Sequence, residues 1–261
     1  MKRKILFLTL ALTLLPTFAY AEKVNNEKVK LLTQQEISIL IDEVGFIKED
    51  FEAVPVEVAR DLIEQKAKKI SNGVVKSFTM EKQPQTGIVP MSLEPVDIDL
   101  YGNAYVTQGT DLPGFKKILM VASFKWKFNP NWRLTDKMSI GYPATNKFIL
   151  NASNGQVLGH TNRTYLLQDP SLRSESYTPS DFVLGAGVAA TFELYNAPTG
   201  GSIIQYVYVP DSESGTSNVL VRYGHKKLTW GAPSIGVYPA GLAVSPSTNV
   251  ENADYWLTLT W

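Results

Sequence analysis

The chain has 261 residues, with 25 Lys+Arg, 25 Asp+Glu, two histidines and no cysteine. The lack of cysteine excludes disulfides, cysteine-ligated zinc, iron–sulfur clusters and thiol catalysis. The balanced charge gives no electrostatic reason to expect nucleic acid or a strongly anionic membrane as a partner. With 44% hydrophobic and 19% charged residues, the chain can form one sizeable domain with an appendage.

Residues 1–21 have the pattern of a secretory signal. Lys2–Lys4 is basic, Ile5–Leu15 is apolar, and Ala19–Ala21 has the small-x-small sequence of a cleavage site. Pro16 interrupts the apolar run, which is shorter than the ~20 residues that a membrane-spanning helix needs. We therefore expect cleavage after Ala21 and a secreted, extracellular mature chain without a transmembrane helix.

Residues 22–82 are predicted to form a small helical hairpin and a lead-in strand. Thr33 and Glu36 match a capping box, and Gly45 can end the first helix in a left-handed conformation. A second helix can begin at Pro55 and continue to Asn72-Gly73, with an apolar stripe of Ala59, Leu62, Ile63, Ala67 and Ile70. Residues 46–54 are interpreted as the connection between the two helices.

A linker is predicted at residues 83–95, which contain three prolines and a glycine. From residue 96 to 261 the apolar residues alternate instead. Phe124, Trp126 and Phe128 share one face of a strand, and Asp97, Asp99 and Tyr101 are expected on the solvent side of another. Further strands are predicted near 74–82, 136–142, 146–152, 157–168, 181–195, 203–209, 219–223 and 255–261. This pattern predicts a mainly β protein, an antiparallel β-sandwich with a small N-terminal helical hairpin.

The sequence contains little that resembles a catalytic or metal site. His160 and His225 have no second ligand at short spacing, so we interpret them as surface or turn residues. Asp97–Gly102 superficially resembles a calcium loop but lacks its later oxygen ligands. Asp136 is a candidate carboxylate for glycoside hydrolysis, although a turn-capping role explains it better. We therefore predict no catalytic residue, no metal and no cofactor.

Aromatic residues are the more suggestive feature. Trp132 and Trp230 are expected in loops or at strand ends, where exposed rings can stack on sugars, unless they close the ends of the sandwich. Residues 183–209 combine small and alternating apolar residues around Gly200-Gly201. This pattern fits either a membrane-inserting hairpin or an ordinary buried one.

Several motifs of the β body resemble those of a group of uncharacterised secreted proteins of spore-forming Gram-positive bacteria. They are Phe-Lys-Trp-Lys-Phe at 124–128, the run from Trp132 to Tyr142, Tyr223-Gly-His225, and the terminal Thr-Leu-Thr-Trp at 258–261. The resemblance implies an exported bacterial origin and a β-rich body, and it transfers no functional residue.

These observations favour a secreted, non-enzymatic bacterial binding protein that acts at the cell envelope or extracellular matrix. A cell-envelope glycan is the expected partner, with Trp132 and Trp230 as the binding residues. The alternatives are a membrane-active, pore-forming protein that inserts residues 183–209, and an extracellular hydrolase that uses carboxylates such as Asp136.

Overall fold

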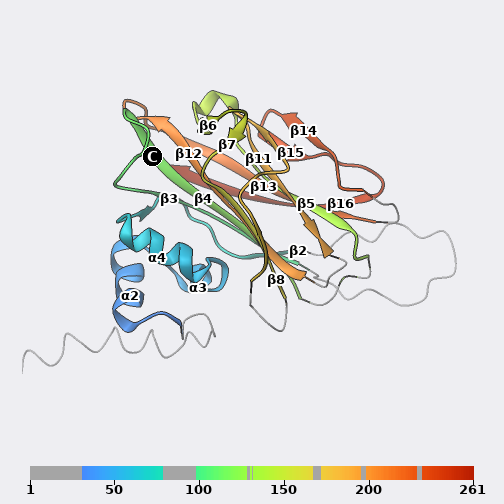
Figure 1. Cartoon of the computed structure of the whole chain (residues 1–261), viewed down its shortest axis with the longest axis horizontal. Coiled ribbons are helices and arrows are strands. Elements are labelled where there is room, and N and C mark those ends of the chain that lie inside the picture. Colours follow the sequence, from blue (N-terminus) through green and yellow to red (C-terminus); the bar gives the residue numbers. More distant parts are fainter. Residues whose placement is uncertain are drawn as a thin grey trace, which may run out of the picture.

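A computed structural model describes residues 31–78, 98–127, 130, 132–166, 172–194, 198–227 and 231–261. The predicted signal at 1–21 and the linker at 83–95 lie outside these residues. Two antiparallel sheets pack face to face, and a helical segment covers the outer face of one of them (Figure 1). The predicted fold class, an antiparallel β-sandwich with a small N-terminal helical segment, is therefore confirmed.

The large sheet is seven-stranded in the described residues and has the order β1-β3-β4-β12-β8-β9, with β2 also paired to β3. The bounds of its strands are β1 (Lys68–Lys69), β2 (Lys76–Phe78), β3 (Ile98–Val106), β4 (Phe115–Trp126), β8 (His160–Leu166), β9 (Leu172–Ser176) and β12 (Pro198–Pro210). The long β4–β12 pair, with Ile203 opposite Ala122, forms the centre of this sheet.

The small sheet has five strands in the order β10-β11-β5-β13-β16. Its strands are β5 (Thr135–Gly141), β10 (Asp181–Val183), β11 (Gly187–Glu193), β13 (Thr216–Lys226) and β16 (Val250–Thr260). Two short hairpins lie outside the sheets, β6 (Ala152–Ser153) with β7 (Gln156–Val157) and β14 (Ile235–Tyr238) with β15 (Gly241–Val244).

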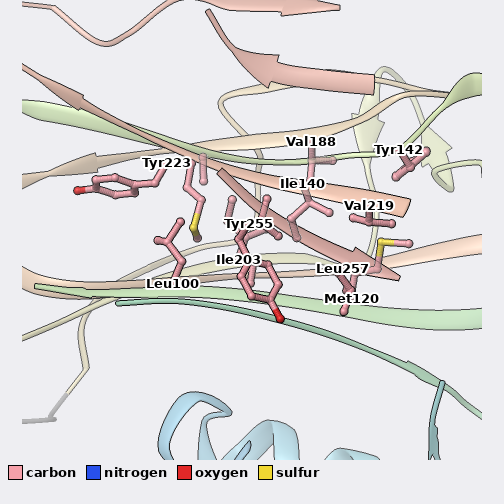
Figure 2. Close-up of a cluster of buried hydrophobic side chains, with 14 of the residues drawn as sticks. Leu100, Met120, Ile140, Tyr142, Val188, Ile203, Val219, Tyr223, Tyr255 and Leu257 are labelled. Atoms are coloured by element: carbon pink, nitrogen blue, oxygen red, sulfur yellow. The ribbon is translucent and has the colours of Figure 1, made fainter. Parts of the chain in front are cut away.

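The main core lies between the two sheets, where alternate residues of facing strands meet (Figure 2). Phe124 and Trp126 are buried there, whereas Lys125 between them is exposed, as the alternation of this strand predicts. Other members of this core are Leu100, Met120, Ile140, Val188, Ile203, Val219, Tyr223, Tyr255 and Leu257.

The helical segment contains α2 (Gln34–Ile39), the π-helical turn η2 (Leu40–Val44), α3 (Lys48–Ala53) and α4 (Val56–Glu64). Thr33 and Glu36 form the predicted capping box, and Gly45 ends the helix with a φ of 90°. The prediction that 46–54 is only a connection is wrong, because α3 begins where Asp50 caps the backbone N–H of Ile47.

The second predicted helix is shorter than expected. It ends at Glu64 rather than at Asn72-Gly73, and Lys66 then turns the chain with a φ of 45°. Lys68 and Lys69 pair with Val106 and Tyr105 of β3, so edge-strand hydrogen bonds replace the last helical turns.

The helices pack on the outer face of the large sheet, so the helical segment is joined to the sandwich (Figure 1). This contact corrects the expectation for Tyr101, which is buried beneath the helices rather than exposed on a solvent face. The second apolar cluster includes Leu40, Phe46, Phe51, Leu62, Tyr105, Leu119, Val121 and Ile204.

Residues 146–152 are not the strand that the sequence predicts. They follow the 3₁₀ turn η3 (Ala144–Asn146), form one isolated bridge from Ile149 to Tyr208, and reach β6 only at Ala152. Strands β9, β14 and β15 were not predicted. Within the residues that the structure describes, the helices are too short or too polar to cross a membrane.

Candidate ligand-binding cleft

A polar cleft of about 580 Å³ opens where the edges of the two sheets diverge. On one side it is bounded by β8 and β9, the last two strands of the large sheet, and on the other side by β11 of the small sheet. The connection from β9 to β10 runs from one sheet to the other past the same cleft. The lining residues are Asn162, Arg163, Thr164, Ser174, Glu175, Ser176, Thr178, Ser180, Thr191, Phe192 and Glu193.

The sheet register explains why hydroxyl and amide groups gather in this cleft. Asn162 lies opposite Ile203 and Thr164 opposite Gly201, and Ile203 belongs to the core between the sheets. Since cross-strand neighbours share a face, Asn162 and Thr164 point into the space between the sheets. Their partners on the edge strand are Ser176 and Ser174, and the Thr164 and Ser174 hydroxyls lie 2.7 Å apart.

A charged group lies on the opposite face of the same two strands. Arg163 and Glu175 pair with each other between the residues that point into the cleft, and Nη1 of Arg163 lies 3.4 Å from Oε2 of Glu57 on α4. Arg163 donates from Nε to Oε1 of Glu175 at 2.5 Å, and the Tyr177 hydroxyl donates to Oε2 of the same carboxylate at 2.6 Å. The Tyr177 hydrogen bond, with the help of Arg163, lowers the pKa of Glu175. Glu175 is therefore an ionised acceptor at neutral pH, and the Tyr177 ring beside it is 66% exposed.

Trp132 is exposed but is not among the residues that line the cleft. It precedes β5 by three residues, and the first residue of β5, Thr135, pairs with the cleft residue Glu193. Trp132 thus precedes the end of β5 that pairs with the cleft-bordering end of β11. Trp230 lies outside the described residues, so its expected partnership with Trp132 stays a prediction.

Asp136 does not border any cleft, which contradicts both interpretations of it. It is completely buried inside the sandwich, on β5. Its carboxylate accepts hydrogen bonds from the Tyr223 hydroxyl and, at 2.9 Å, from the backbone N–H of Lys226. Burial raises the pKa of Asp136, although these donors and His225 oppose that shift.

The interpretation of both histidines as surface or turn residues is also wrong. Nδ1 of His225 lies 2.9 Å from Oδ2 of Asp136, and its ring packs edge-on against Trp126 at 4.8 Å. His160 is buried on β8, with Nδ1 2.9 Å from Oε1 of Gln205. Burial lowers the pKa of His160 to about 4.

The tautomer of His160 follows from the hydrogen bonds of Gln205. The Gln205 amide nitrogen donates to the carbonyls of Leu158 and Tyr206, so its oxygen must face His160 and accept from Nδ1–H. Nε2 of His160 then carries no proton, and it has no hydrogen-bond partner among the described residues.

The described residues hold no group of three or more His, Asp or Glu side chains placed to bind a metal ion. Asp99 forms an ion pair with Lys127 at 3.1 Å, and Asp97 of the calcium-like sequence lies outside the described residues.

Residues 183–209 do not form a hairpin of either predicted kind. β11 pairs with β10 and β5 in the small sheet, whereas β12 pairs with β4 and β8 in the large sheet. The two strands therefore belong to opposite layers. Insertion of this segment as a hairpin would require it to leave both sheets.

No protein-family model matches the chain, and no curated protein matches it. Among solved structures, it is similar to the crystal structure of the KRT10-binding region domain of the pneumococcal serine-rich repeat protein PsrP. The identity is 10%, the match covers 59% of this chain and 87% of that one, and the TM-score is 0.29. At this TM-score the match carries no argument about ligand or mechanism.

The cleft was not predicted from the sequence, although one signal for it was present. The run Ser174-Glu-Ser-Tyr-Thr-Pro-Ser180 places hydroxyl groups on alternate positions of a strand and on the turn after it. Its meaning depends on β8 and β11, which come from distant regions of the chain.

Proposed function

We propose that the protein is an exported, non-enzymatic binding protein of the bacterial cell envelope or extracellular matrix, and that the cleft takes a glycan. The observation that carries this proposal is the lining of the cleft. Serine and threonine hydroxyls and the amide of Asn162 offer the donors and acceptors that a polyhydroxylated ligand requires.

An aromatic ring would supply the second element of a sugar site. Sugar rings present C–H groups that pack on an aromatic face while their hydroxyls bond to polar neighbours. Tyr177 is exposed, but it bonds to Glu175 on the opposite face of β9 and does not line the cleft. Trp132 and Trp230 are proposed as the stacking residues.

The electrostatics of Glu175 favour binding over glycoside hydrolysis. A general acid for that reaction needs a raised pKa so that it holds a proton at neutral pH. The pKa of Glu175 is lowered instead, and its oxygens already accept hydrogen bonds from Arg163 and Tyr177, which argues against that role.

The direct test is retention of the mature protein on purified cell walls and insoluble glycans, followed by titration with soluble fragments of any glycan that retains it. Trp132→Ala should raise Kd about tenfold, and Ser176→Ala about fivefold through one lost hydrogen bond. Tyr238→Ala is a matched control, because Tyr238 is an exposed tyrosine on β14, away from the cleft.

Three outcomes would contradict the proposal. The first is lack of retention on every wall and glycan, and the second is unchanged affinity in Trp132→Ala and Ser176→Ala. The third is turnover of a glycan substrate. Dye release from liposomes would instead favour the pore-forming alternative.

A further inference from the structure

A buried group of polar side chains joins the helical segment to the large sheet. Asp50 of α3 and Asn103 of β3 are completely buried, and the side chain of Lys69 on β1 is 10% exposed. Nζ of Lys69 lies 2.8 Å from Oδ2 of Asp50, and Nδ2 of Asn103 donates to Oδ1 of the same carboxylate at 2.7 Å. One carboxylate thus binds both an amine and a carboxamide, and it also accepts hydrogen bonds from the hydroxyls of Tyr101 and Tyr105.

The strand register explains why Lys69 and Asn103 meet. Lys69 lies opposite Tyr105 on β3, and the bonds between Ser71 and residues 103–104 continue this pairing. Lys69, Ser71, Asn103 and Tyr105 therefore share the face that the helices cover. Phe46, whose ring lies 5.7 Å from that of Tyr105, helps to separate this face from solvent.

We infer that Lys69 and Asn103 form a spontaneous intramolecular amide crosslink, with Asp50 as the proton carrier. Oδ2 of Asp50 lies 2.8 Å from Nζ of Lys69, so this carboxylate can accept a proton from Lys69 and leave a free amine. A desolvated neutral lysine is a nucleophile. The only electrophilic carbonyl of a side-chain amide in this group is Cγ of Asn103.

The reaction balances without an oxidant or a co-reactant. Nζ of Lys69 attacks Cγ of Asn103, and the Ser71 hydroxyl, which bonds to Oδ1, stabilises the negative charge on that oxygen. Asp50 passes its proton to Nδ2, and the bond from Cγ to Nδ2 breaks, so that ammonia leaves. Asp50 then takes the second proton from Nζ and passes it to the ammonia, which becomes ammonium. One amide bond forms and one is lost.

The crosslink would tie β1, which follows the helices, to the central region of the large sheet. It closes a loop over residues 70–102 in a chain that has no cysteine for disulfides. This inference is independent of the glycan proposal, because the crosslink lies under the helices and the cleft lies between the sheets.

The experiment is intact-protein mass spectrometry of the folded mature chain, followed by tryptic peptide mapping. We expect a mass about 17 Da below the sequence value, which is the loss of one ammonia. The map should contain a branched peptide that joins Lys69 to Asn103, since trypsin does not cleave after an acylated lysine. Peptide mapping also separates this loss from cyclisation of the N-terminal residue.

Lys69→Arg keeps the positive charge beside Asp50 but cannot react, so it should have the full mass. Lys68→Arg is the matched control, because Lys68 is the exposed neighbour on the same strand and should keep the branched peptide. Full mass in the wild-type protein after prolonged incubation would overturn the inference. A loss of about 18 Da in a Lys69–Asp50 peptide would also overturn it, because water rather than ammonia would have left.

Discussion

The two histidines of the chain are both buried in the sandwich, but their hydrogen-bond partners differ. His225 is next to the buried carboxylate of Asp136, which also binds Tyr223 and the backbone N–H of Lys226. His160 faces only the neutral amide of Gln205. The comparison shows that burial alone does not define the behaviour of a titratable group, because the partner decides which protonation state the fold favours.

The two histidine environments affect the stability of the fold in different ways. At His225 the carboxylate is an acceptor for a ring proton, and loss of either partner leaves the other buried without its counterpart. At His160 a second ring proton would have no acceptor among the described residues, so the fold favours the neutral ring. The first cluster is therefore sensitive to mutation, and the second is sensitive to acid.

The largest effect is expected for Asp136→Ala. This change leaves the Tyr223 hydroxyl, the Lys226 N–H and His225 buried without their acceptor, and it should lower the free energy of unfolding by about 3–5 kcal/mol. Urea denaturation measures the difference. Glu213→Ala is the control, since its side chain is 36% exposed and its ion pair with the exposed Lys147 should be worth no more than about 1 kcal/mol. Equal losses in the two variants would contradict the role assigned to burial.

The second effect is acid sensitivity at His160. Its folded pKa of about 4 lies below the ordinary 6.5, so between these values the unfolded state binds more protons and stability falls as pH falls. The free energy of unfolding should lose about 3 kcal/mol from this group between pH 7 and pH 4. Urea midpoints measured across that range give the slope.

Other groups titrate in the same range, so a variant must isolate His160. Asp136 acts in the opposite direction. Its pKa is raised in the folded state, so the folded state binds more protons than the unfolded state as the pH falls, and this contribution increases stability. His160→Gln removes only the histidine contribution and should flatten the loss of stability on acidification. Parallel curves for the wild-type protein and this variant would show that His160 is not the acid-sensitive group.

Gln205→Glu converts the environment of His160 into one like that of His225. At pH 7 the variant should be less stable by about 2 kcal/mol, because the carbonyls of Leu158 and Tyr206 lose their donor. The new carboxylate should favour the charged imidazole, so the variant should lose less stability than the wild-type protein when the pH falls from 7 to 4. An unchanged pH slope would mean that the partner does not control His160.

The sequence predicted the elements of this molecule that depend on local or periodic patterns. The capping box at Thr33 and the burial of Phe124 and Trp126 follow from residues within a few positions of one another. The end of the second helix was missed because Ala67 and Ile70 continue its apolar spacing, whereas pairing of Lys69 with Tyr105 decides the structure. Both histidine sites were missed for the same reason. His225 and Asp136 are 89 positions apart, and only the register of β5 and β13 brings them together.

The candidate site was predictable only in its chemistry, as exposed aromatic residues next to polar strands. Its position was not, because Ser174, Thr164 and Phe192 come from three strands in two sheets.

The smallest effect concerns the hydrogen-bond chain that only the His225 cluster possesses. Nε1 of Trp126 donates to the Tyr223 hydroxyl at 3.0 Å, and that hydroxyl donates to Asp136. Tyr223→Phe breaks both bonds but keeps the ring, and Asp136→Asn keeps the size of the acceptor but not its charge. If the bonds act as one chain, the double variant should lose less free energy of unfolding than the sum of the losses in the two single variants. The difference, the coupling energy of the double-mutant cycle, should be about 1 kcal/mol. Additive losses in urea denaturation would instead mean that Tyr223 and Asp136 stabilise the core independently.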